Sequence, residues 1–505
     1  MKRSFLEERK PVKQMASPDK LTSRANRQPH QDDATAEEIS SSFDIVARWK
    51  IVSTPEKENS SLSANGMEAF SSYNPDVEKR RPEVHVEILV HPSSSNSEFQ
   101  IGSLVRKAIR KTFKQLQQRS HEFPFNHSAK MVSLPELSRA LTSPGSGLDR
   151  QVQEVAFESG DEEGVALSSF DDVKWQLYVY KLQNDPATED DMGHETPAAT
   201  HRILPSEEHR GLWESLVYDS DVKQKLLNYS VETVLFSKLN VDDDLVSWNK
   251  VILLHGPPGT GKTSLCKALA QKLSIRLVEH YSSVYLMEVN SHSLFSRWFS
   301  ESGKLVMKMF QSMEEVVKQN SSLVILLIDE VESLTRARQA SISGNEPSDA
   351  LRAVNALLTQ IDKIKRYPNV LILTTSNLSQ AIDLAFVDRA DIKQYIGNPS
   401  QAAREAILLS SISELIKRGV LGSDPSLLLP ESSDSRSLLT AAAKATHEFS
   451  GRALRKLPFL TKALKFPGNI GIPVTDFLRG MVTMAREQRS DAESLKSSKS
   501  PSNGS

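Results

Sequence analysis

The amino-acid sequence predicts an α/β fold built on a parallel β-sheet, followed by a helical lid and preceded by a small α+β domain. Two observations lead to this prediction. Between residues 201 and 399, apolar runs alternate with segments of helical periodicity, which is the order of parallel strands joined by crossover helices. Beyond Pro399 the periodicity is helical only, which predicts helices that follow the sheet.

Composition divides the N-terminal part of the chain. Residues 1–80 are rich in Ser, Asn, Gln, Glu and Lys and can bury little apolar surface, so we expect a disordered leader. Residues 81–200 are expected to form the small α+β domain with flexible loops. Its expected elements are a strand at 84–90, a helix at 101–119, a strand at 173–182 and a flexible connection at 183–200.

The larger sheet is expected within residues 201–399 and the lid within 400–488. The expected strands of the sheet lie at 251–254, 283–289, 323–328, 370–373 and 393–396. The expected lid helices lie at 402–416, 437–445, 451–464 and 474–487. The low-complexity residues 489–505 are predicted to be a disordered tail.

Composition also limits the classes of function. The 505 residues include 62 Lys and Arg against 64 Asp and Glu, so the formal charge is only −2 and no global basic field favours nucleic-acid binding. The single cysteine, Cys266, excludes an intramolecular disulfide and suits a reducing compartment. The longest apolar run, 323–328, is far too short to span a bilayer, so no membrane partner is expected.

A glycine-rich segment follows the first strand of the large sheet. It fits the pattern G-x-x-x-x-G-K-[ST] in the strand–loop–helix setting that this phosphate-binding motif requires. Its backbone amides can surround phosphates, the lysine reaches the β and γ phosphates, and the threonine hydroxyl ligates Mg²⁺. The nucleotide-binding residues predicted here are Gly256, Pro257, Pro258, Gly259, Thr260, Gly261, Lys262, Thr263 and Ser264.

Two acids stand at the end of the apolar run 323–328. Asp329 is predicted to hold Mg²⁺ together with Thr263, and Glu330 to polarise the attacking water as general base. Tandem acids after a strand are usually a solvated turn when they occur alone. The phosphate loop upstream favours the catalytic interpretation, because an ATPase needs an acid at the end of a second strand.

Three further positions are candidates. Asn377 ends another apolar strand, where its carboxamide can orient the attacking water. Arg389 can serve as an arginine supplied to the γ-phosphate of a neighbouring subunit, a contact worth about 10³- to 10⁵-fold in rate. The alternative for Arg389 is a surface ion pair with Asp388 or Asp391.

The start of a predicted lid helix carries two arginines. Arg452 and Arg455 are three residues apart, so both can share one helical face and one of them can lie on the phosphates. The sequence does not distinguish between the two.

In this order the motifs resemble the AAA+ ATPases, and within them the remodellers of HORMA-domain proteins. The similarity runs from about residue 204 to 487 and is densest in HGPPGTGKTSLCKALAQKL, SHSLFSRWFSESGKLV, IDEVESL, EPSDALRAVNALLTQID, FVDRADIKQYIG and SGRALRKLPFL. It implies a hexameric ring that binds ATP and Mg²⁺ at subunit interfaces. Asn377 would be sensor 1, Arg389 the trans-acting finger, and Arg452 or Arg455 sensor 2.

The same resemblance makes Arg297, Trp298 and Phe299 a pore loop that grips a substrate polypeptide. Large aromatic side chains can grip any chain through apolar contact and stacking. The alternative is that Trp298 and Phe299 are core residues of a helix.

The resemblance also implies that residues 81–200 recognise the substrate or its adaptor, and it implies clients and a location. The implied clients are HORMA-domain proteins, which an adaptor HORMA protein presents and which the ring converts from the closed to the open form. The implied location is meiotic chromosomes in the nucleus, with the spindle checkpoint and the cytoplasm as further settings. One alternative is a clamp loader or helicase acting on nucleic acid, which the aromatic loop and slightly acidic chain disfavour. The other is a nucleotide-gated scaffold, which has no need of Glu330 or Arg389.

Overall fold

The computed structural model describes most of the chain beyond residue 82. The residues described are 83–119, 137, 141, 148, 151–159, 170–171, 173–189, 199–239, 241–242, 245–290, 302–319, 321–333, 348–377, 384–422, 424 and 434–497. All of them belong to one structural unit, Lys79–Ser505. The predicted leader, 1–80, lies outside the described residues. Among the described residues, no helix is both long and apolar enough to cross a membrane.

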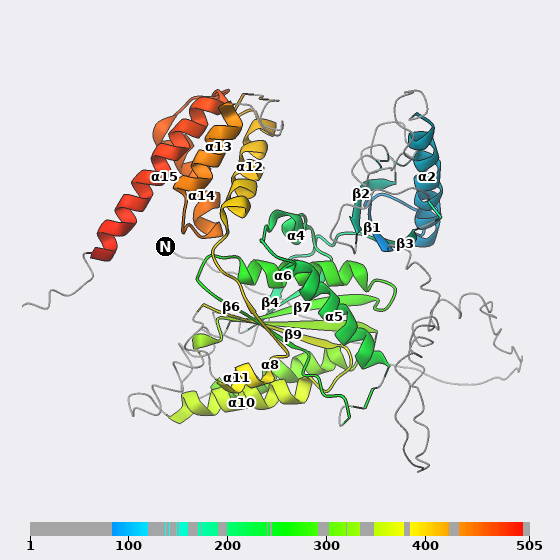
Figure 1. Ribbon diagram of the computed structural model, residues 1–505. Coiled ribbons are helices and arrows are strands. Elements are labelled where there is room, and N and C mark those ends of the chain that lie inside the picture. Colours follow the sequence, from blue (N-terminus) through cyan, green and yellow to red (C-terminus); the bar gives the residue numbers. More distant parts are fainter. Residues whose placement is uncertain are drawn as a thin grey trace, which may run out of the picture. The chain divides into compact units, whose positions relative to one another are not determined.

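A seven-stranded sheet forms the centre of the large subdomain (Figure 1). Its strand order is β10-β6-β9-β8-β7-β5-β4. The parallel strands are β6 (Val251–His255), β7 (Ser283–Asn290), β8 (Ser322–Asp329), β9 (Val370–Ser376) and β10 (Ile392–Tyr395). This confirms the predicted parallel sheet, and each of its five expected strands is present.

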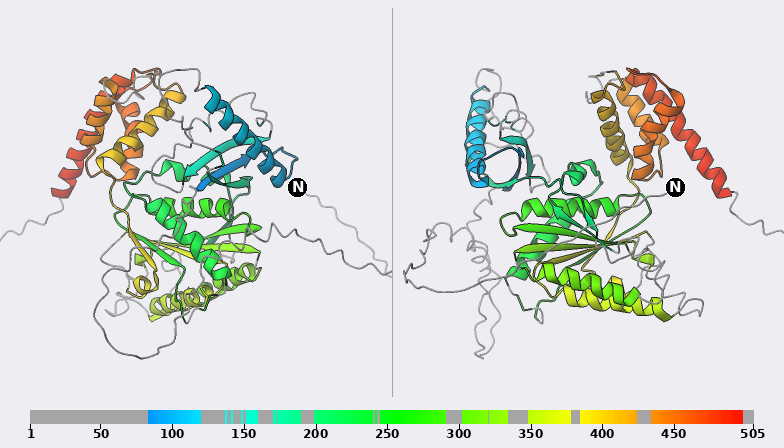
Figure 2. Two further views of the ribbon diagram at one scale, coloured as in Figure 1. Left: turned by 45° about the vertical axis from the view of Figure 1, so that its right-hand side comes forward. Right: turned by 180° about the vertical axis from the view of Figure 1, so that it is seen from behind.

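Helices cover both faces of this sheet (Figure 1; Figure 2). The helices of this subdomain are α4 (Leu212–Ser215), α5 (Val222–Lys238), α6 (Lys262–Arg276), α8 (Ser302–Val317), α10 (Ser348–Ile364) and α11 (Leu384–Arg389), with a 3₁₀ turn at Glu207–His209. In β8, Leu323, Ile325 and Leu327 pack on the side of α5 and α6, while alternate residues pack on the side of α8 and α10. Burial on both faces explains why the strand is an unbroken apolar run.

The edge of the sheet beside β7 differs from the prediction. The strand β5 (Ala199–Leu204) pairs antiparallel with β7, and the two-residue strand β4 (Thr188–Glu189) pairs with β5. The segment 183–200, interpreted from sequence as a flexible connection, therefore contributes to the large sheet, and the expected boundary at residue 200 falls inside β5. The paired residues are 80 to 90 positions apart in sequence, so no local pattern marks the strand.

The lid consists of four helices, as predicted. These are α12 (Gln401–Lys417), α13 (Asp434–Ala445), α14 (Gly451–Lys465) and α15 (Val474–Ser497), which share one core. The prediction that the chain is disordered from 489 is wrong as far as Ser497, because α15 continues to that residue. The ion pair of Arg489 with Glu493, one turn apart at 3.0 Å, supports this exposed end.

The small N-terminal domain is α+β, as predicted. It comprises β1 (Glu83–Val90), α2 (Glu98–Arg119), β2 (Val152–Ser159) and β3 (Lys174–Tyr180), with the strand order β2-β1-β3. The side chains of Val84, Val86 and Ile88 are fully buried in its core. The sequence analysis missed β2, because the surrounding stretch is rich in Gly, Ser and acidic residues. Its pairing with β1 is what makes it a strand.

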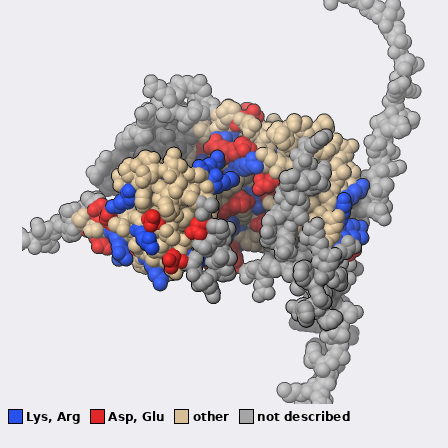
Figure 3. All heavy atoms as spheres, turned by 90° about the horizontal axis from the view of Figure 1, so that it is seen from above, with Lys and Arg blue, Asp and Glu red and all other residues tan. Residues whose placement is uncertain are grey.

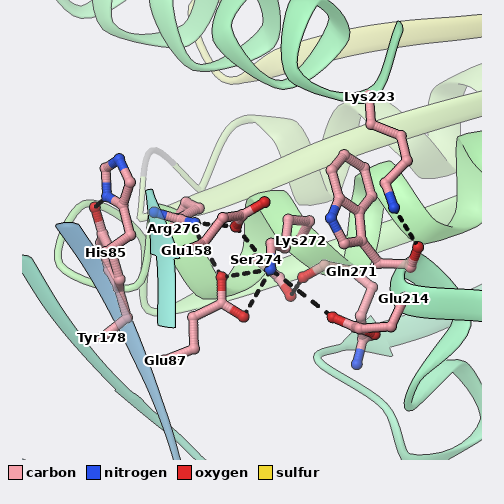
Figure 4. Close-up of polar contacts among 11 residues, drawn as sticks. His85, Glu87, Glu158, Tyr178, Glu214, Lys223, Gln271, Lys272, Ser274 and Arg276 are labelled. Carbon is pink, nitrogen blue, oxygen red and sulfur yellow. Dashed lines mark hydrogen bonds and ion pairs between the residues drawn. The ribbon is translucent and has the colours of Figure 1, made fainter. Parts of the chain in front are cut away.

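A charge cluster joins this domain to α6 (Figure 4). Lys272 Nζ lies 2.8 Å from a carboxylate oxygen of Glu87 and 3.1 Å from Glu158 Oε2. Arg276 Nε lies 3.0 Å from Glu87 Oε1, and Arg276 also pairs with Glu158. Burial, aided by the charge of Arg276, lowers the pKa of His85 to about 4, so this neighbour is neutral at pH 7. Glu214 Oε1 lies farther from Lys272 Nζ, at 3.9 Å, so two basic side chains meet three acidic ones at this contact.

Removing one base from this cluster is expected to destabilise the protein. Lys272→Met leaves Arg276 as the one basic partner of Glu87, which is buried, and of Glu158, and it also removes the more distant partner of the exposed Glu214. Breaking a buried ion pair on one side costs about 3–5 kcal/mol, whereas removing both partners is often nearly neutral. We therefore expect a lower unfolding midpoint in urea and faster amide exchange in β1 for Lys272→Met, with recovery in the double variant Glu87→Gln/Lys272→Met. If the unfolding midpoint fell equally in the single and the double variant, Lys272 and Glu87 would not act as a charge pair.

Candidate active site

The predicted phosphate loop lies between β6 and α6 and has the backbone that phosphate binding requires. Gly256 has a φ of 144°, and a Cβ placed there would come within 2.2 Å of the carbonyl oxygen of Ile396. Gly261, at the N-cap of α6, has a φ of 92°. Only glycine adopts these conformations readily, so the loop can curl at the helix N-terminus, where backbone amides favour anions.

Lys262 begins α6 and turns back across the loop. Its Nζ donates to the carbonyl oxygens of Gly256, at 3.0 Å, and Pro257, at 2.8 Å. Burial lowers the pKa of Lys262, while the carboxylates of Glu332 and Asp329 act in the opposite direction. A phosphate bound inside the curled loop can pair with this buried ammonium.

The structure brings Thr263 and Asp329 together, as the sequence predicted. Thr263 Oγ1 donates to Asp329 Oδ1 at 2.9 Å, and Thr375 Oγ1 donates to the same oxygen. A hydroxyl and a carboxylate are hard oxygen ligands of the kind that Mg²⁺ takes alongside water and substrate phosphates. The residues present therefore fit a Mg²⁺ site at the mouth of the loop.

Glu330 and Asn377 also meet. Asn377 Nδ2 donates to Glu330 Oε1 at 3.2 Å, across the ends of the neighbouring strands β8 and β9. Glu330 has a φ of 56°, a left-handed conformation that non-glycine residues rarely adopt. Such conformations persist where the surroundings fix them, and they are found preferentially at functional sites.

The lid approaches the loop through the first turn of α14. The backbone N–H of Arg452 donates to Gly259 O at 3.0 Å, which places this turn against the phosphate loop. Arg455 Nη2 donates to Ser215 O at 2.5 Å, in α4. The two arginines that the sequence left equivalent therefore differ: the backbone of Arg452 touches the loop, whereas the side chain of Arg455 is bound to α4.

Arg389 ends α11 and forms a two-point ion pair. Its Nε and Nη2 lie 3.0 and 2.6 Å from the two carboxylate oxygens of Asp362 in α10. The sequence had suggested Asp388 or Asp391 as the ion-pair partner of Arg389, and not Asp362. Asp391 instead accepts hydrogen bonds from Tyr229 Oη and from the backbone N–H of Lys250. The finger role predicted for Arg389 concerns a second subunit and stays a prediction.

Some site residues lie outside what can be described, and others were missed. The predicted pore loop, Arg297, Trp298 and Phe299, falls outside the described residues, between the end of β7 and the start of α8. Sequence analysis did not single out Thr375 or Tyr218, whose hydroxyl donates to Gly261 O at 3.5 Å. Both reach the site from distant parts of the chain, so no contiguous motif could have identified them.

Comparison with known families assigns the class. The class is that of the AAA ATPases. In this class a curled phosphate loop follows one strand, here β6, and an acid pair ends the strand two places away in the sheet, here β8. A helical lid follows the sheet. The family model described as "ATPase family associated with various cellular activities (AAA)" matches residues 252–398. A second, "TRIP13-like, AAA+ ATPase lid C-terminal domain", matches residues 400–489. The protein is therefore an ATPase with a nucleotide-binding AAA core.

Individual relatives show which family of AAA ATPases this chain belongs to. The mouse "Pachytene checkpoint protein 2 homolog" is 44% identical over 429 residues, which are 82% of this chain and 95% of the relative. The human one is 46% identical over 398 residues, 76% of this chain and 88% of the relative. The "Structure of C. elegans PCH-2" superposes with a TM-score of 0.61 at 33% identity and covers 81% of this chain and 99% of that one. The chain belongs to the pachytene checkpoint protein 2 family.

Proposed function

We propose that this ATPase is a ring-shaped remodeller that converts HORMA-domain proteins from the closed to the open form. The observation that carries the catalytic half is the contact of Asp329 with Thr263 and of Glu330 with Asn377 at the mouth of the phosphate loop. Membership of the pachytene checkpoint protein 2 family supports the substrate half. The proposed settings are meiotic chromosomes in the nucleus and the spindle checkpoint, with the cytoplasm as a further location.

The proposed reaction uses the chain's own residues as follows. ATP binds with its phosphates against the amides of the loop and the ammonium of Lys262, and Arg452 closes on it from the lid. Mg²⁺, held by Thr263 and Asp329, would neutralise charge on the phosphate oxygens. Glu330 orients and deprotonates the attacking water, and Asn377 fixes the carboxylate of Glu330 and senses the γ-phosphate.

Assembly completes the proposed site. In a hexamer, Arg389 of one subunit would reach the γ-phosphate bound by its neighbour, so hydrolysis depends on the ring. Arg297, Trp298 and Phe299 would then line the central channel and draw in the client, presented by an adaptor HORMA protein. The nearly equal numbers of acidic and basic residues favour a protein client over a nucleic acid. On the face shown in Figure 3, acidic and basic side chains lie side by side.

Steady-state ATP hydrolysis tests the proposal. The purified protein is measured alone, with a closed HORMA-domain protein plus adaptor, and with single- or double-stranded DNA. We expect stimulation by the HORMA protein and none by DNA. Stimulation by DNA alone would leave the ATPase standing and overturn the client assignment in favour of a nucleic-acid machine.

The pore-loop assignment gives a separate prediction. Trp298→Ala is expected to keep basal ATP hydrolysis but to lose conversion of the closed HORMA protein, because the grip on the polypeptide is lost while the nucleotide site is untouched. Conversion is followed by ion-exchange chromatography of the two client forms. Trp298→Phe, which keeps an aromatic ring, serves as the matched control. Normal conversion by Trp298→Ala would remove this residue from the channel.

A further inference from the structure

The side chain of Thr375 lies at the end of β9, beside the acid pair of β8. It is 1% exposed. Its hydroxyl donates to Asp329 Oδ1 and accepts from the backbone N–H of Glu330 at 3.2 Å. Its carbonyl oxygen accepts from the backbone N–H of Val331 at 2.9 Å. One residue therefore binds three consecutive residues of the acid segment.

The hydroxyl of Thr375 acts both as a hydrogen-bond donor and as an acceptor. A hydroxyl has a single proton to donate, and here that proton goes to the carboxylate of Asp329. A lone pair remains for the N–H of Glu330. The same Asp329 oxygen also accepts from Thr263, so two threonines from different elements hold this carboxylate in one orientation.

These contacts also bear on the conformation of Glu330. The left-handed φ of this residue is unfavourable for a side chain with a Cβ and has to be imposed by its surroundings. Thr375 binds the N–H of Glu330 itself and the N–H of the next residue, and so fixes the peptide units on both sides. In that conformation the Glu330 carboxylate faces Asn377.

We propose that Thr375 is a positioning residue for ATP hydrolysis, which aims Asp329 at the metal position and Glu330 at the attacking water. Thr375 acts through these two acids and contributes no group to the phosphate loop. The proposal rests on the roles proposed above for Asp329 and Glu330. It predicts an effect on turnover and on the Mg²⁺ requirement, with nucleotide binding by the loop preserved.

Valine is the decisive substitution, because it has the shape of threonine without the hydroxyl. Loss of a group that orients a metal ligand typically costs about 10- to 100-fold in activity or metal affinity. Thr375→Val is therefore expected to lower kcat and to raise the Mg²⁺ concentration for half-maximal activity within that range. Affinity for a fluorescent ADP analogue without Mg²⁺ should stay unchanged. Thr375→Ser, which keeps the hydroxyl, should restore kcat.

The neighbouring residue provides a matched control. Thr374 is also 1% exposed in β9, but its hydroxyl donates to the carbonyl oxygen of Ile252 at 3.0 Å, within the sheet. Thr374→Val removes a buried hydroxyl from the same strand without touching the acids. It is expected to lower the thermal unfolding midpoint about as much as Thr375→Val, with little change in kcat or in the Mg²⁺ requirement.

Each outcome decides the question. Equal effects of the two valine variants on kcat would show that Thr375 only stabilises the strand, and an unchanged kcat in Thr375→Val would overturn the proposal directly. If Thr375→Val does not fold, Thr375→Ala is measured against Thr374→Ala in the same way.

Glu330→Gln is measured in parallel. If Glu330→Gln keeps its turnover, Glu330 does not have the proposed catalytic role. If Glu330→Gln loses turnover while Thr375→Val stays fully active, only the positioning role of Thr375 is wrong.

Discussion

Replacing Arg389 with alanine is expected to lower ATP turnover by about 10³- to 10⁵-fold, the range found for arginines supplied to a neighbour's γ-phosphate. Within one subunit the guanidinium is bound at two points by the carboxylate of Asp362. In the proposed ring it contributes to the adjacent site. The measurement is kcat at saturating ATP, together with nucleotide affinity, which should hardly change.

Two controls separate this role from a structural ion pair. Asp362→Ala removes the partner and keeps the arginine, so it should retain most of the turnover if Arg389 acts on nucleotide. Mixing Arg389→Ala with Glu330→Gln subunits should restore part of the activity, because some interfaces then combine an intact finger with an intact base. If Asp362→Ala is as damaging as Arg389→Ala and the mixture is inert, Arg389 acts by stabilising α11 on α10.

Glu330→Gln is expected to lower turnover by about 10²- to 10⁴-fold while ATP stays bound, because glutamine keeps the shape of the side chain but is no base. Its amide oxygen can still accept from Asn377, which donates to Glu330 Oε1 at 3.2 Å. The structure should therefore be unperturbed, and client is expected to remain trapped on the ring. Single-turnover hydrolysis and ATP binding are the two measurements.

Asn377→Ala provides the comparison for this variant. It removes the donor to Glu330 and leaves the carboxylate in place, so we expect a smaller loss of turnover than in Glu330→Gln. A normal rate in Glu330→Gln would assign the base to another group. A loss of ATP binding in that variant would instead give Glu330 a part in holding the nucleotide.

Sequence analysis predicted the elements whose signal is local. The central strand β8 is buried on both faces and so forms an unbroken apolar run that can be read directly. The phosphate loop is likewise contiguous, since one turn of chain must supply all its amides. The lid helices carry regular periodicity, although α15 continues past the predicted end, where the ion pair of Arg489 with Glu493 supports its exposed turns.

Contacts between distant segments were not predictable in this way. The partner of Arg389 is Asp362, in a different helix, and no spacing rule connects the two residues. The hydroxyl of Thr375 meets Asp329 only because β8 and β9 are neighbours in the sheet. In each case the signal lies in the topology, which a single sequence does not display.

The antiparallel strand β5 has a practical consequence for isolating the ATPase. The AAA match begins at residue 252, yet β5 pairs with β7 along six residues, from Ala199 opposite Val289 to Leu204 opposite Val284. A fragment that starts after Leu204 would leave β7 as a bare edge, with its free N–H and C=O groups open to pairing with other molecules. Such a fragment is expected to self-associate, so a usable minimal ATPase has to include β5.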